Sequence, residues 1–108
     1  MGANIAVLQQ SLERLMPSRS FEESLTKLLL VQARRNLLKY QMMDRRFQRK
    51  YRKTFEQFRA ERLGSPMSFE VEQDYFDWEL AVTGIDEIKD EIERLEALLH
   101  EYRQLASG

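Results

Sequence analysis

The charged residues of this 108-residue chain are separated by sign along the sequence. Residues 1–68 contain fourteen Lys and Arg against six Asp and Glu, a net charge of +8, whereas residues 69–108 contain three against twelve, a net charge of −9. The sign changes at Gly64-Ser65-Pro66, in a chain with only four Gly and two Pro. Oppositely charged segments on either side of such a break predict two arms that attract each other.

Both arms carry helical periodicity. A short pattern over about 3–16 places Ile5, Leu8, Leu12 and Leu15 on one face and ends before Pro17. A long basic helix over about 21–63 is expected to begin at a capping box formed by Ser20 and Glu23. An acidic helix over about 67–105 follows, capped by Ser65 or Ser68. Its apolar residues alternate at spacings of three and four, typical of a coiled coil: Trp78, Ala81, Ile85, Ile88, Ile92, Leu95, Leu99 and Tyr102.

We therefore predict an all-α fold, with residues 1–108 as a single helical domain. Its main feature is a long, coiled-coil-like antiparallel hairpin, preceded by a short N-terminal helix. A reversal at residue 65 would place position i opposite about 130 − i. Gly64 suits the end of the basic helix, and the acidic helix is expected to continue through Gly84.

The basic arm has more apolar residues than one hairpin can enclose, because they occupy more than one stripe. An exposed band of this kind usually marks an interface. The predicted partner-binding residues are Leu28, Leu30, Val31, Leu38, Met42, Met43 and Phe76. A homodimer with a four-helix arrangement is the simplest way to cover them, and a groove for a different protein is the alternative.

A dense basic segment supports two interpretations. It contains Arg45, Arg46, Arg49, Lys50, Arg52 and Lys53, with Phe47 and Tyr51 between them. These cations could follow a phosphate backbone. We favour their neutralisation by the acidic arm of the same chain, since the sequence pI is about 5.9. Six cations within nine residues nevertheless surround the helix, so some must face solvent.

Aromatic residues are densest at Tyr75-Phe76-Asp77-Trp78. We expect Tyr75 and Trp78 to fill the end of the hairpin against Tyr51, Phe55 and Phe58, with Phe76 directed outward.

No catalytic, cofactor or metal site is expected, and the chain is predicted not to be an enzyme. Cysteine is absent, and no Gly-rich phosphate loop occurs. His100 and Glu96 supply too few ligands for zinc. The sequence has no apolar stretch long enough to cross a membrane and no signal-peptide pattern, which predicts a cytoplasmic protein.

One stretch, from Leu37 to Leu95, resembles a type of short all-helical prokaryotic protein often encoded beside a small toxin. The likeness rests on Phe47, Tyr51 and Phe55 before the turn and on the segment 74–79 after it. The resemblance implies an antitoxin-like role, in which the chain binds and masks a small toxin-like partner.

The predicted function is therefore a non-enzymatic protein–protein interaction module, regulatory or antitoxin-like. The alternatives are a nucleic-acid-associated protein that uses residues 45–53 and a purely structural oligomerising scaffold.

Overall fold

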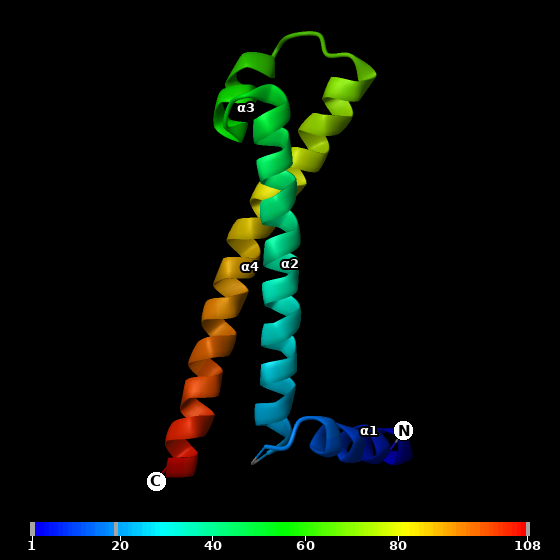
Figure 1. The fold of residues 1–108 in the computed structure, drawn as a ribbon, viewed down its shortest axis with the longest axis vertical. Coiled ribbons are helices and arrows are strands. Elements are labelled where there is room, and N and C mark those ends of the chain that lie inside the picture. Colours follow the sequence, from blue (N-terminus) through cyan, green and yellow to red (C-terminus); the bar gives the residue numbers. More distant parts are fainter. Residues whose placement is uncertain (1, 19, 108) are drawn as a thin grey trace. The chain divides into compact units, whose positions relative to one another are not determined.

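The computed structural model describes residues 2–18 and 20–107, and within these ranges it contains helices and no strands (Figure 1). The helices are α1 (Gly2–Leu15), α2 (Phe21–Tyr51), α3 (Phe55–Arg62) and α4 (Phe69–Ser107). The two long helices, α2 and α4, pack against each other, which confirms the all-α helical hairpin. No helix in the described ranges is long and apolar enough to cross a membrane.

The chain forms two compact units. Unit 1 comprises Met1–Arg34 and Glu91–Gly108, and unit 2 comprises Arg35–Asp90. In unit 1 the buried apolar residues are Leu30, Ala33 and Leu95. An exposed ion pair there joins Arg34 of α2 to Glu96 of α4 at 3.1 Å.

Serine residues begin both long helices, as the sequence predicted. The Ser20 hydroxyl accepts a hydrogen bond from the backbone N–H of Glu23 at 3.1 Å. The Ser68 hydroxyl accepts one from the backbone N–H of Val71 at 3.2 Å, which identifies Ser68 rather than Ser65 as the cap of α4. Each bond satisfies a donor that has no partner inside the helix.

The prediction of one helix over 21–63 is wrong, because α2 ends at Tyr51 and α3 begins at Phe55. Arg52 adopts a left-handed conformation with φ of 55°. Thr54 then caps α3: its hydroxyl accepts from the Gln57 N–H at 3.2 Å, while the Gln57 side chain accepts from the Thr54 N–H at 3.0 Å. This reciprocal capping box starts a second helix without any Gly or Pro.

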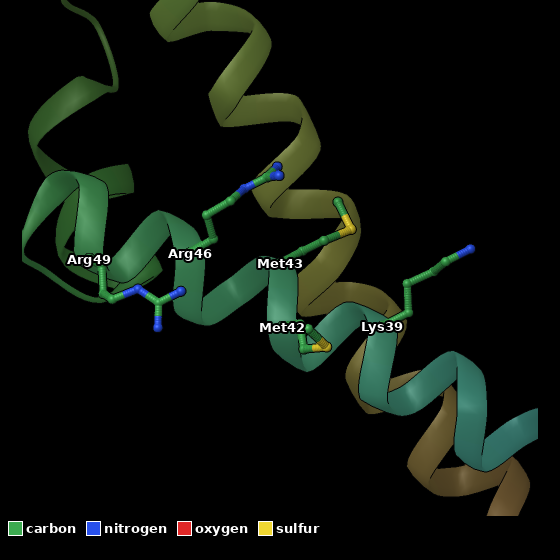
Figure 2. A pocket seen from close by; sticks show the side chains of 5 residues that line it. All are labelled: Lys39, Met42, Met43, Arg46 and Arg49. Atoms are coloured by element: carbon green, nitrogen blue, oxygen red, sulfur yellow. The ribbon is translucent and has the colours of Figure 1, made fainter.

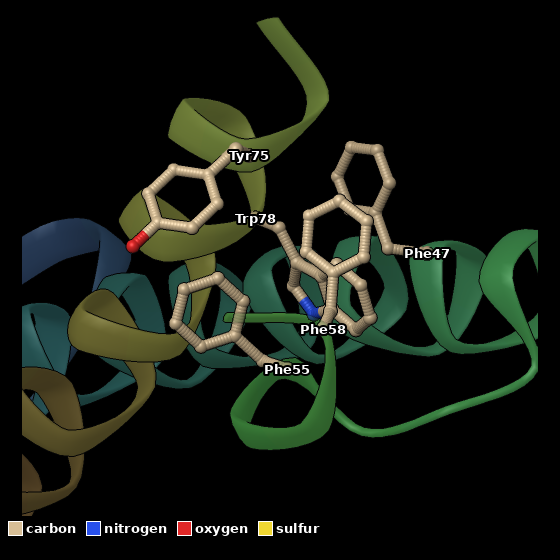
Figure 3. Packing of buried hydrophobic residues seen from close by; sticks show 5 residues of the cluster. All are labelled: Phe47, Phe55, Phe58, Tyr75 and Trp78. Atoms are coloured by element: carbon tan, nitrogen blue, oxygen red, sulfur yellow. The ribbon is translucent and has the colours of Figure 1, made fainter. Parts of the chain in front are cut away.

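The break lets α3 place two phenylalanines on Trp78, as Figure 3 shows. The ring centroids of Phe58 and Phe55 lie 5.1 and 5.4 Å from that of Trp78. A left-handed non-glycine residue costs about 1–2 kcal/mol, whereas burying each phenylalanine gains about 1.5–3 kcal/mol. Burial therefore outweighs the strain at Arg52. The core cluster of unit 2 consists of Phe47, Phe55, Phe58, Tyr75 and Trp78, with Tyr51 packed beside it.

The expected packing of Tyr75 and Trp78 is thus confirmed, but the register at Trp78 is displaced, whereas the Arg34–Glu96 pair has the predicted register. The indole N–H of Trp78 donates to Asp44 at 2.8 Å, whereas a reversal at residue 65 would have placed Trp78 opposite residue 52. The displacement arises because α3 folds back over the end of α2, so residues 52–68 all take part in the reversal. The helices approach closely at Gly84, where a Cβ atom would lie 2.8 Å from Cε2 of Tyr40, and α4 continues through this position.

We expect Arg52→Gly to stabilise the protein, because glycine adopts a positive φ without the steric cost that arginine bears. The gain should be a few tenths to about 1 kcal/mol, since glycine also loses more entropy on folding. The control is Arg45→Gly within α2, which should lower stability by about 1 kcal/mol. Thermal denaturation followed by circular dichroism measures both. Equal losses in the two variants would mean that the helix does not break at Arg52.

Candidate interaction site

Two of the six cations in the basic segment are neutralised within the chain. The Lys50 ammonium, at the end of α2, lies 3.0 Å from a carboxylate oxygen of Glu70 and 2.5 Å from one of Asp74. Lys53 forms an ion pair with Glu61 of α3. For Lys50 the predicted neutralisation by the acidic arm agrees with the geometry, whereas Lys53 pairs with a residue outside that arm.

Asp74 is the centre of a small polar network. Its carboxylate also accepts a hydrogen bond from the Tyr51 hydroxyl at 2.5 Å. Burial alone would raise the pKa of Asp74, but the hydrogen bonds from Lys50 and Tyr51 outweigh it and lower that pKa below its usual value. Hydrogen bonds to Asp74 and then Glu70 raise the pKa of Lys50. Burial, followed by the hydrogen bond to Asp74, raises the pKa of Tyr51 to about 12.

The remaining cations point to solvent. Arg45, Arg49 and Arg52 are exposed and form no ion pair with any residue in the described part of the chain. Arg46 is also exposed, and its guanidinium lies 5.1 Å from the centroid of the Phe47 ring. The basic segment is therefore divided: two lysines form ion pairs in unit 2, three arginines face solvent, and the exposed Arg46 lies over the Phe47 ring and near Asp74.

Some of these arginines border an apolar depression of about 310 Å³ on the surface of α2. Its lining residues are Lys39, Met42, Met43, Arg46 and Arg49. Figure 2 shows Lys39, Met43 and Arg46 extending along one edge of this face of α2 and Arg49 along the other, with Met42 between them. Two methionines with three cations around them form what we call the Met–Arg face.

The predicted partner-binding residues have different environments. Leu28, Val31, Leu38, Met42 and Phe76 are exposed, and Met43 is partly buried. Leu30 is only 2% exposed, so its inclusion in an outward surface is wrong. It lies one turn before the buried Ala33, on the inward face of α2. Lys39 was missed, although it lies three residues before Met42 and seven before Arg46, a spacing that places all three on one face.

The outward face of α4 carries a second apolar stripe in unit 2. Phe76 is exposed and meets the Tyr75 ring edge-on at a centroid distance of 5.9 Å. Leu80, one turn later, and Phe69, two turns earlier, are exposed as well. Phe76 is therefore part of a helix face that unit 2 does not cover.

No group of three or more His, Cys, Asp or Glu residues in the described ranges is arranged to hold a metal ion. Comparison with known proteins found no match: no family model, no curated protein and no solved structure is significantly similar to this chain.

The hydrogen bond from Tyr51 to Asp74 makes the free energy of unfolding decrease at alkaline pH. The pKa of Tyr51 is raised from 10.0 to about 12. The stability that the protonated Tyr51 hydroxyl contributes is therefore complete below pH 10 and is lost as the pH rises through 12. We expect wild type to be more stable than Tyr51→Phe by a constant margin from about pH 7 to 9. The margin should shrink between about pH 10 and 12. Thermal denaturation across this range tests the prediction, and a margin that is unchanged at about pH 12 would contradict it.

Proposed function

We propose that this chain is a non-enzymatic protein–protein interaction module that binds an acidic, amphipathic helix of a partner protein on the Met–Arg face. The observation that carries the proposal is the combination of an exposed apolar depression at Met42 and Met43 with the cations Lys39, Arg46 and Arg49 around it. An apolar site bordered by one sign of charge favours a ligand with apolar anchors and the opposite charge.

The chemistry of the lining residues supports this type of ligand. Methionine is flexible and polarisable, so Met42 and Met43 can adapt to apolar side chains of different shapes. A partner helix would place anchors at i and i+3 or i+4 in the depression. Acidic residues beside those anchors would then meet the arginines, which favours fast association and fixes the orientation.

Two further predictions belong to this proposal. The resemblance to antitoxin-like proteins suggests that the partner is a small toxin-like protein that the chain masks. A cytoplasmic location is part of the same proposal. If no partner of any kind binds, a purely structural, oligomerising role is the interpretation that remains.

We expect Met42→Glu to weaken partner binding strongly. The new carboxylate would repel an acidic partner, while its position four residues before Arg46 favours the helix itself. Leu63→Glu is a matched control, because Leu63 is 62% exposed, similar to Met42 at 59%, and lies at the end of α3. The source organism's proteins, including the product of any neighbouring reading frame, are captured on tagged wild type and on both variants.

The affinity of any captured protein is then measured by calorimetry. A central anchor contributes roughly 2 kcal/mol, so Met42→Glu should raise Kd about 30-fold or more. Leu63→Glu should retain wild-type affinity. Equal binding by Met42→Glu and wild type would refute the Met–Arg face as the binding site.

The second candidate function is association with nucleic acid, which is favoured by the exposed Arg45, Arg49 and Arg52, since none of them forms an ion pair within residues 2–18 and 20–107. If each contacts one phosphate of duplex DNA, log K should fall with log salt concentration at a slope of about −3. Changing all three to alanine should remove binding. Fluorescence anisotropy with a labelled duplex measures this, and no binding by wild type at low salt would end this interpretation.

A further inference from the structure

Helix α1 is amphipathic, yet none of its residues is buried. Its apolar stripe contains Ile5, Leu8, Leu12 and Leu15, and Leu8 is 66% exposed. Glu13 and Arg14 are its only charged residues, so Gly2–Leu12 carries no charged side chain. An isolated helix of this length is marginally stable in water, and it gains most of its stability when its apolar face is covered.

The connection from α1 to α2 is held by hydrogen bonds. The buried Ser24 hydroxyl donates to the Met16 carbonyl at 3.0 Å. The Ser18 hydroxyl donates to the Ser20 carbonyl at 2.7 Å and is also hydrogen-bonded to Ser24. In unit 1, α1 projects away from the start of α2, and these bonds link the two helices (Figure 1).

The side of α1 that meets its own chain is not the apolar one. A depression of about 350 Å³ at the start of α2 is lined by Ala6, Gln9, Gln10 and Glu13 of α1, together with Phe21. At 100° per residue these α1 positions lie on a different side of the helix from Ile5, Leu8 and Leu12. The apolar stripe is therefore left uncovered by unit 1 of its own chain.

A matching surface exists on α2 in the same unit. Phe21, Leu25, Leu28 and Leu29 are all exposed and follow helical spacing. Their face spans about 12 Å along the helix, against about 15 Å for the α1 stripe from Ile5 to Leu15. The α1 stripe contains no charged residue, and on α2 the exposed Glu22 lies at the edge of the Phe21–Leu29 face, three residues before Leu25.

We propose that a second copy of this chain covers these surfaces, with α1 of each copy packed on the Phe21–Leu29 face of the other. This inference rests on the proposed function as an interaction module, but it uses a different surface from the Met–Arg face. The reciprocal exchange closes as a two-fold symmetric dimer, in which each α1 stripe meets one Phe21–Leu29 face. The net charge of −1 adds little repulsion between copies.

The available area fits a dimer of ordinary size. The exposed side chains of the two faces offer on the order of 400 Å² of apolar surface per copy, at roughly 50–60 Å² for each half-exposed side chain. A standard interface buries about 800 Å² per partner, of which roughly 60% is apolar. Contact by only one α1 helix would supply about half of this, which favours the reciprocal arrangement.

Sedimentation equilibrium of the full chain between about 1 and 100 µM tests the proposal. We expect a mass of twice 12.9 kDa for wild type. Leu8→Glu on the stripe and Leu28→Glu on the α2 face should each weaken the dimer by at least about tenfold. Gln10→Glu adds the same charge on the other side of α1 and should leave the dimer unchanged. A wild-type chain that stays monomeric throughout this range would overturn the proposal.

Disulfide formation between introduced cysteines can distinguish packing of α1 on a second copy from packing on its own chain, because the natural sequence has no cysteine. A mixture of Leu8→Cys and Leu28→Cys single variants should form a disulfide between the two different chains on mild oxidation. The double variant, oxidised at high dilution, should not form one within a chain, and such a bond would show that α1 folds back on its own hairpin. Met42→Glu should remain dimeric, so loss of partner binding and loss of the dimer are distinguishable.

Discussion

The structure of unit 2 depends on the complete burial of Trp78. An indole N–H buried without an acceptor would cost about 1–3 kcal/mol, and Asp44 accepts it at 2.8 Å. The aromatic rings of Phe58 and Phe55 can reach Trp78 only because the chain reverses after Tyr51. Burial of Trp78 of α4 thus fixes how α4 pairs with α2. It also requires α3 to be a separate helix, and the burial of its phenylalanines outweighs the conformational strain at Arg52.

The sequence contained enough to predict the hairpin, but not where its basic arm ends. Separated charges and the heptad pattern of α4 indicated two long paired helices, and Ser20, Ser68 and Gly64 mark helix ends as expected. The break at Arg52 was missed because Phe47, Tyr51, Phe55 and Phe58 keep a helical spacing across it. Periodicity cannot reveal a break that preserves the phase of the apolar residues. The local signal was the Thr54–Gln57 capping box, which the absence of Gly and Pro made easy to overlook.

In the candidate site, the sequence also could not predict which individual residues face outward. Four apolar residues occur consecutively at 28–31, and successive helix positions differ by 100°. Composition therefore indicated that some would face outward, but not that Leu30 would be the buried one. The basic segment behaves in the same way: Arg49 and Lys50 are neighbours, yet Arg49 borders the Met–Arg face while Lys50 pairs with Glu70 and Asp74. Only the position of α4 decides which neighbour faces which way.

The two units differ in how far they bury their own apolar side chains. Unit 2 encloses a five-residue aromatic cluster and pairs Lys50 and Lys53 within itself. Unit 1 buries Leu30, Ala33 and Leu95, and leaves large apolar side chains exposed on α1, on the start of α2 and on α4. Since hydrophobic burial is the main favourable term in folding, unit 2 can be stable through its own contacts, whereas unit 1 gains most from contacts that another chain supplies. In such an arrangement, association stabilises the part of the molecule that contains α1, while the surface of α2 in unit 2 stays available for a different partner.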